Sequence, residues 1–292
     1  MNNFNPLTCF LVMPVTEEKF WQKLEKLERD QVLPSLILDL EDAVSPKYKE
    51  WGRSMVRDRI QRISELMKGG SRRIFLRINE VDSDECHNDL LLLKDMYDNG
   101  CKISVVLPKV ESRNDIEVFL SRLGFTPSEL FVAIESLAGY KNVDEIFNFP
   151  IVHYCTIGLE DLTAGMGYCR PLNFYRDEIL KKIVVDVAVS AQARNIKCMA
   201  PLWPFLNYPE LLPSYIDEIL CGLSAHMSGM VIFHPYQIEY VKFFWSNQAL
   251  IDGYRKVVNH RKDRLSDQIA QTSSACAVFD FKMIDMPELK RI

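Results

Sequence analysis

Two carboxylates follow apolar segments of the chain at a spacing that could bring them to one metal ion. Glu135 comes directly after residues 131–134, and Asp161 comes shortly after residues 151–157. Both segments are rich in β-branched and aromatic residues, as buried strands are. The acids lie 26 residues apart, about the length of one strand–helix–strand unit, whose parallel strands end side by side. Because Mg²⁺ binds through one or two carboxylates and keeps several waters, the pair predicts a magnesium site.

Each acid taken alone has a simpler interpretation, as a loop residue or as a cap on the following helix, because a short motif is only a hypothesis. The elements that would position both acids decide between these interpretations. Eight apolar segments are expected to be strands, at 8–13, 36–40, 73–78, 103–107, 131–134, 151–157, 196–200 and 229–233. Segments with helical spacing lie at 17–29, 46–67, 84–97, 115–123, 173–195, 208–222, 236–247 and 252–268.

This alternation favours parallel strands with helical crossovers, and eight such units that close on themselves form a (β/α)₈ TIM barrel. An open doubly wound sheet is the alternative, but no Gly-x-Gly-x-x-Gly follows any strand. Residues 1–248 are expected to form the barrel, and residues 249–292 a C-terminal helix and lid segment. The helix at 46–67 is expected to turn Trp51, Met55, Ile60 and Ile63 inward, and the helix at 173–195 to pack Ile179.

The amino-acid composition indicates what kind of protein the chain forms and which partners it is expected to lack. Of the 292 residues, 48% are hydrophobic and 26% are charged, which is typical of a globular protein. The net charge of −5 argues against nucleic acid as a partner, since such proteins carry a basic face. The eight cysteines form no Cys-x-x-Cys pair, and the apolar segment at 7–15 is too short to cross a membrane. We therefore expect a cytoplasmic protein that binds no membrane.

The active site of such a barrel lies at the C-terminal ends of its strands. The polar residues expected there are Asp39, Glu41, Asp42, Arg77, Asn79, Lys109, Glu111, Glu135, Asp161 and His234. Several acids together with an Arg and a Lys suit Mg²⁺ and a small carboxylic acid, because Arg binds a carboxylate with two hydrogen bonds. The metal would polarise an oxo or enolate oxygen. The histidines, including His234, are expected to be structural or solvated.

Several motifs together resemble one family. Leu38-Asp-Leu-Glu-Asp-Ala-Val-Ser-Pro46 resembles the signature of the citrate lyase β-subunit-like family, which includes the malyl-CoA lyase-type aldolases. The later motifs of that family follow in its order, as Arg77-Ile-Asn, Leu107-Pro-Lys-Val-Glu-Ser, Ile134-Glu-Ser, Gly158-x-x-Asp161-Leu, His234-Pro-x-Gln237 and Met283-Ile-Asp285-Met-Pro. The resemblance spans essentially the whole chain.

This resemblance implies a TIM barrel with a C-terminal lid and a Mg²⁺-dependent carbon–carbon lyase or aldolase. Glu135 and Asp161 match the metal ligands of the family, and Arg77 matches its substrate-binding and catalytic arginine. Glu41 and Asp42 match acids that orient metal-bound water, and Lys109 is expected to bind substrate. Asp285 matches the catalytic acid that the lid lends to a neighbouring subunit, which implies a homotrimer or a homohexamer.

The chain departs from the family where coenzyme A (CoA) would bind. The turn after the first strand usually carries basic residues, but here it reads Pro14-Val-Thr-Glu-Glu18, and acids repel a pyrophosphate. Further departures stand at Thr8-Cys9, Met199-Ala200 and Gly229-Met230. A substrate that is not a CoA thioester is therefore expected, and a CoA thioester is the alternative. A barrel that binds a ligand without catalysis, and phosphoenolpyruvate-type chemistry, are rival functions.

Overall fold

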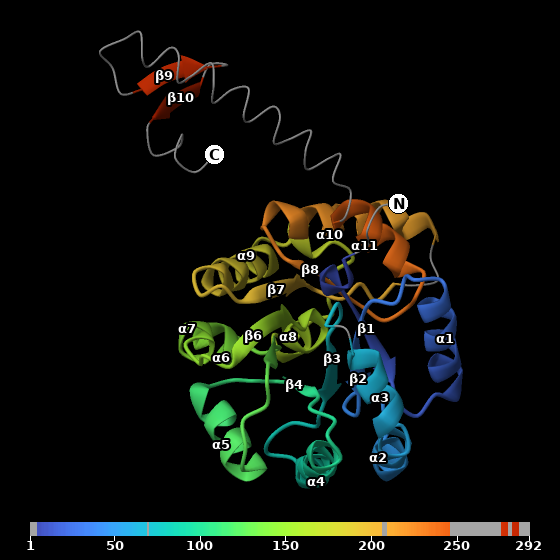
Figure 1. The fold of residues 1–292 in the computed structure, drawn as a ribbon. Coiled ribbons are helices and arrows are strands. Elements are labelled where there is room, and N and C mark those ends of the chain that lie inside the picture. Colours follow the sequence, from blue (N-terminus) through green and yellow to red (C-terminus); the bar gives the residue numbers. More distant parts are fainter. Residues whose placement is uncertain (1–4, 69, 206–208, 246–275, 280–281, 286–292) are drawn as a thin grey trace. The chain divides into compact units, whose positions relative to one another are not determined.

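Eight parallel strands close into a barrel in the computed structural model, which describes residues 5–68, 70–205, 209–245, 276–279 and 282–285 (Figure 1). The strands follow one another around the barrel in chain order, and β8 closes it by pairing with β1. They are β1 (Cys9–Pro14), β2 (Ser35–Asp39), β3 (Ile74–Arg77), β4 (Ser104–Leu107), β5 (Leu130–Ile134), β6 (Val152–Ile157), β7 (Lys197–Ala200) and β8 (Gly229–Ile232). The expected (β/α)₈ TIM barrel is confirmed.

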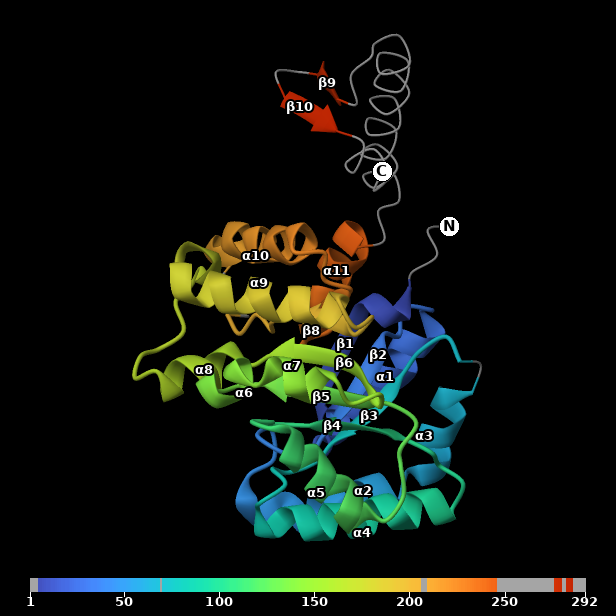
Figure 2. The ribbon, with the colours of Figure 1, turned by 90° about the vertical axis from the view of Figure 1, so that its left-hand side faces the viewer.

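Helices surround the barrel and connect its strands (Figures 1 and 2). The described α-helices are α1 (Glu18–Arg29), α2 (Lys49–Arg57), α3 (Ile60–Met67), α4 (Asp84–Asp98), α5 (Arg113–Leu123), α6 (Leu137–Lys141), α7 (Val143–Phe147), α8 (Leu159–Gly165), α9 (Glu178–Gln192), α10 (Leu212–Ser224) and α11 (Gln237–Trp245). Short 3₁₀ turns lie at Pro6–Thr8, Pro46–Tyr48, Phe174–Arg176 and Pro209–Leu211. Helix α9 packs on β7, and α10 packs on β7 and β8 (Figure 1).

Three expectations about the helices were wrong. The segment at 46–67 is not one helix, because α2 ends at Arg57 and α3 starts at Ile60. Trp51 is 55% exposed, since the inner face of α2 is formed by residues 52, 53, 55 and 56 instead. Ile179 is 58% exposed, because it lies in the first turn of α9, which begins only at Glu178. The Asp177 carboxylate caps this turn by accepting hydrogen bonds from the backbone N–H of Ile179 and of Leu180.

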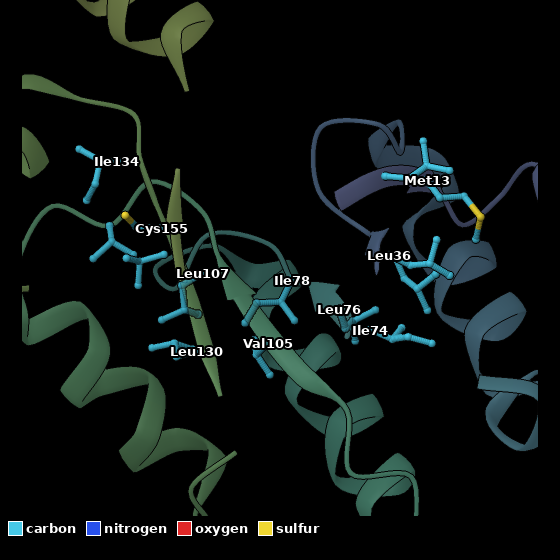
Figure 3. Packing of buried hydrophobic residues seen from close by; sticks show 14 of the residues in the cluster. Met13, Leu36, Ile74, Leu76, Ile78, Val105, Leu107, Leu130, Ile134 and Cys155 are labelled. Atoms are coloured by element: carbon cyan, nitrogen blue, oxygen red, sulfur yellow. The ribbon is translucent and has the colours of Figure 1, made fainter. Parts of the chain in front are cut away.

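The apolar core has two layers. The larger layer lies between the strands and the helices and includes Leu36, Leu76, Leu107 and Ile134 (Figure 3). A smaller inner cluster fills the barrel itself and consists of Phe10, Ile37, Phe75, Val106, Phe131, Tyr154, Met199 and Val231. Its four aromatic rings pack with centroids 5.3 to 5.8 Å apart, mostly edge to face. This plug closes the barrel centre and leaves chemistry to the strand ends.

The barrel unit ends at Trp245, and residues 246–292 belong to a second compact unit. The described part of that unit is an antiparallel pair, β9 (Cys276–Phe279) with β10 (Lys282–Asp285). The helix expected at 252–268 lies outside the described residues. In the described ranges, none of the helices has the length and apolar character needed to span a bilayer.

Candidate active site

An ion pair between Arg77 and the buried Asp39 lies at the strand ends. Asp39 is the last residue of β2 and Arg77 is the last of β3, and the register of the two strands sets them side by side. Arg77 donates from Nε to Asp39 Oδ1 at 2.7 Å and from Nη2 to Oδ2 at 2.5 Å. The Arg77 Nη1 lies 3.0 Å from Glu41 Oε2, yet this oxygen has no hydrogen-bond partner among the described residues. The guanidinium therefore keeps a donor for a ligand in the barrel mouth.

Lys109 stands among the acids of the mouth. Its Nζ lies 2.6 Å from Glu41 Oε1, 3.5 Å from Asp42 Oδ1 and 3.9 Å from Asp161 Oδ2. Its backbone has φ +51°, a left-handed conformation that few non-glycine residues adopt. In this conformation the Lys109 N–H donates to Glu135 Oε2 at 3.0 Å, so one residue contacts acids that follow three different strands, β2, β5 and β6.

Glu135 is buried directly after β5 and depends on the absence of a side chain at Gly158. A Cβ on Gly158 would lie 2.4 Å from Glu135 Oε1, so no larger residue fits beside this carboxylate. Burial raises the pKa of Glu135 to about 7, with further contributions from the neighbouring Glu41 and Asp161, while Arg77 lowers it. A carboxylate that is disfavoured in this way gains from a nearby cation.

Asp161 lies in the first turn of α8, not in the loop that was one interpretation of its position. Its side chain is 45% exposed, and it lines the same mouth cavity of about 220 Å³ as Glu135 and Arg77. Asp42 and Glu160 also line this cavity. Glu135 and Asp161, which the sequence predicts to be neighbours, thus line one cavity, and both side chains are accessible from the barrel mouth.

The donor set fits a magnesium ion. In the described part of the chain, no group of three His, Cys, Asp or Glu side chains could hold a metal alone. Mg²⁺ does not require one, because it commonly uses one or two carboxylates and takes its other ligands from water and substrate. Glu135 and Asp161 would supply those carboxylates, because both line the mouth cavity.

Several residues expected at the mouth do not line the cavity, and Gln237 of the His234-Pro-x-Gln237 motif stabilises a turn. The Gln237 side chain accepts from the backbone N–H of Phe233 and of His234, at 3.2 and 3.1 Å, and so fixes the turn after β8. Neither His234 nor Glu111 is among the described residues that line the cavity. Asn79 is buried and accepts from Lys49 rather than facing the mouth.

One residue of the site was missed from the sequence. Lys49 is buried at the start of α2, and its Nζ donates to the carbonyl oxygens of Leu40 and Glu41, each at 2.7 Å, and to Asn79 Oδ1 at 2.6 Å. Lys49 thereby fixes the loop that carries Glu41. Its position at the start of an amphipathic helix gave no signal, because a lysine there usually faces solvent.

Comparison with known proteins identifies the family. Residues 11–211 match the model of the family described as HpcH/HpaI aldolase/citrate lyase. The chain belongs to this family. The resemblance inferred from the motifs is thereby confirmed, and the chain is a divergent member of the HpcH/HpaI aldolase/citrate lyase family, because the identities to its relatives are low.

Three relatives show the breadth of this family. The chain is 22% identical to a (3S)-malyl-CoA thioesterase of Cereibacter sphaeroides, over 96% of this chain and 90% of the relative. It is 23% identical to the mitochondrial citramalyl-CoA lyase of Homo sapiens, over 99% of this chain and 84% of the relative. The CitE protein of Mycobacterium tuberculosis, solved with magnesium, acetoacetate and coenzyme A, shares the fold with a TM-score of 0.67 at 20% identity, covering 97% of this chain and 94% of that one.

Proposed function

We propose that this chain is a Mg²⁺-dependent carbon–carbon lyase that cleaves a 2-hydroxy acid, free or as an acyl-CoA thioester, into an enolate and a 2-oxo acid. The observation that carries the proposal is that Glu135, Asp161 and Arg77 line one cavity at the strand ends. Relatives of the family include a named lyase, and the related CitE structure was solved with magnesium and a small carboxylate.

In this reaction Glu135 and Asp161 would hold Mg²⁺, which when bound would act as a Lewis acid on the C2 oxygen, the hydroxyl of the substrate that becomes the oxo group of the product. Arg77 would bind a substrate oxygen through Nη1, because Nε and Nη2 already donate to Asp39. The Arg77 charge would stabilise the negative charge that develops as the carbon–carbon bond breaks. Glu41 and Asp42 would orient water, and Lys109 would hold both acids in place through its Nζ contacts.

Proton transfer completes the reaction, since the substrate hydroxyl must lose a proton and the enolate must gain one. We propose Asp285, the last residue of β10, for one of these transfers. The lid that carries Asp285 would come from a neighbouring subunit of a homotrimer or homohexamer.

The direct test is to incubate the full-length protein with a panel of 2-hydroxy acids and their CoA thioesters, with and without Mg²⁺. Release of a 2-oxo acid only in the presence of Mg²⁺ would support the lyase. Glu135→Gln should lose this activity, and full activity of that variant would refute the metal assignment.

Two other outcomes have a specific meaning. Release of free CoA without a 2-oxo acid would indicate a thioesterase, the activity named for the Cereibacter relative. Mg²⁺-dependent ligand binding without any turnover would indicate a barrel that binds its ligand and has lost catalysis.

A further inference from the structure

The mouth cavity has two chemically different parts. Its rim carries the charged groups Asp42, Arg77, Glu135, Glu160 and Asp161. Its floor is made of apolar side chains, among them Val12, Phe131, Leu202 and Val231. A ligand held at the rim by its carboxylate would therefore place the remainder of its structure on an apolar surface.

The floor is closely packed against the inner cluster of the barrel. Phe131 and Val231 belong to the inner cluster that plugs the barrel, and Val12 and Leu202 pack against that cluster from the open side. Phe131 is fully buried and packs at 5.6 to 5.8 Å from the rings of Phe10, Phe75 and Tyr154. A charged ligand group placed on this floor would lose its water, which is costly, and the Thr156 hydroxyl that also lines the cavity already donates to the Met199 carbonyl oxygen.

The charges of the rim also disfavour a second carboxylate on the ligand. Among the described residues that line the cavity, the single cationic side chain is Arg77, and it already carries Asp39 on two of its donors. Lys109 and Arg170 are not among the described residues that line the cavity, and they form ion pairs with Glu41 and with Glu218, respectively. A divalent ion would neutralise Glu135 and Asp161, but it would leave no described cation for a second ligand carboxylate.

We infer that the 2-oxo acid handled by this site is a monocarboxylic acid with a short apolar substituent that lies on the floor formed by Val12, Phe131, Leu202 and Val231. The inference rests on the proposed function, since the metal and Arg77 hold the 2-oxo-carboxylate end. Oxo acids with a second carboxylate are selected against, because that group would face either the apolar floor or the acids of the rim.

A matched ligand pair tests this selectivity. 2-Oxobutyrate and oxaloacetate share a four-carbon chain and differ in having a methyl or a carboxylate at its end. Binding of each to the full-length protein, and of pyruvate, is measured by calorimetry with saturating Mg²⁺ and again with EDTA. We expect 2-oxobutyrate to bind roughly fourfold more tightly than pyruvate, the value of one buried methylene. Oxaloacetate is expected to bind at least tenfold more weakly than 2-oxobutyrate.

Variants of Leu202 test whether the preference for an apolar substituent arises from the floor. Leu202→Asn should abolish the advantage of 2-oxobutyrate over pyruvate, and Leu202→Arg should reverse the order of 2-oxobutyrate and oxaloacetate by supplying the missing cation. Leu220→Arg is the matched control, because Leu220 is exposed on α10, and it should leave all affinities unchanged. Thermal melts identify any variant that fails to fold, and the wild-type ligand series then still decides the question.

The possible results separate the two proposals. Mg²⁺-dependent binding with the apolar preference, lost in Leu202→Asn, supports both. Mg²⁺-dependent binding in which oxaloacetate equals or exceeds 2-oxobutyrate overturns the inference and leaves the lyase proposal standing. Absence of Mg²⁺-dependent binding for every acid overturns both.

Discussion

At the scale of single residues, the proposed metal site makes Mg²⁺ binding depend on the charge state of Glu135. Burial raises its pKa from the ordinary value of 4.5 to about 7, so below pH 7 a metal must displace a proton. Mg²⁺ affinity should therefore fall by about tenfold for each pH unit below 7 and level off above pH 8. Titration calorimetry at pH 6, 7 and 8 measures this, and equal affinities at pH 6 and pH 8 would contradict the assignment.

The raised pKa of Glu135 also affects the stability of the metal-free protein. The folded state binds more protons than the unfolded chain between pH 4.5 and 7, so the Glu135 contribution to stability decreases as pH rises through this window. Mg²⁺ should restore that stability above pH 7, because the ion compensates the buried charge. Thermal melts with and without Mg²⁺ should therefore diverge as pH rises, and curves that stay parallel from pH 5 to 8 would contradict this prediction.

Gly158 provides a second test at the residue scale. In Gly158→Ala the new Cβ would lie 2.4 Å from Glu135 Oε1, which forces the carboxylate out of its place. We expect Mg²⁺ affinity to fall by at least tenfold, the lower end of what displaced metal-site geometry costs, while the fold persists. Gly165→Ala, at the C-terminal end of α8, is the control, since nothing lies within 4 Å of a Cβ there. Equal losses in the two variants would mean that Gly158 has no special relation to Glu135.

At the scale of elements, helix α2 fixes the loop after β2 through Lys49. Replacing it in Lys49→Met would leave the carbonyl oxygens of Leu40 and Glu41 and the side chain of Asn79 without their donor. We expect a loss of about 2 to 4 kcal/mol in the free energy of unfolding, measured in urea. The exposed Lys47 is the control, and Lys47→Met should change stability by less than about 0.5 kcal/mol. Similar stabilities of the two variants would refute this role of Lys49.

The sequence predicts the strands and the strand-end cluster better than side-chain exposure and local backbone conformation. The eight strands followed from apolar segments with β-branched residues, and the clustering of Arg77, Lys109 and Glu135 followed from the rule that strand ends of a barrel meet. The exposure of Trp51 could not be predicted, because the break between α2 and α3 shifts the helical phase at residues 58 and 59. The positive φ of Lys109 had no signal either, since it arises from contacts with residues distant in the chain.

At the scale of the whole molecule, the proposal makes each active site a product of two subunits. Glu135→Gln and Asp285→Asn should each be inactive, but mixed oligomers would contain some sites with an intact metal pair and an intact lid acid. Random mixing should restore roughly a quarter of the wild-type activity if the lid is exchanged between subunits. Mixed oligomers, isolated by two affinity tags, that stay inactive would show that the lid serves its own barrel or none.

The most direct test of the account is anomalous diffraction from crystals grown with Mn²⁺ in place of Mg²⁺. The account predicts one strong peak in the barrel mouth, about 2.1 Å from an oxygen of Glu135 and from an oxygen of Asp161, with water completing the coordination. It also predicts that the peak is lost in Glu135→Gln. A metal peak at any other site in the barrel, or an unchanged peak in that variant, would contradict it.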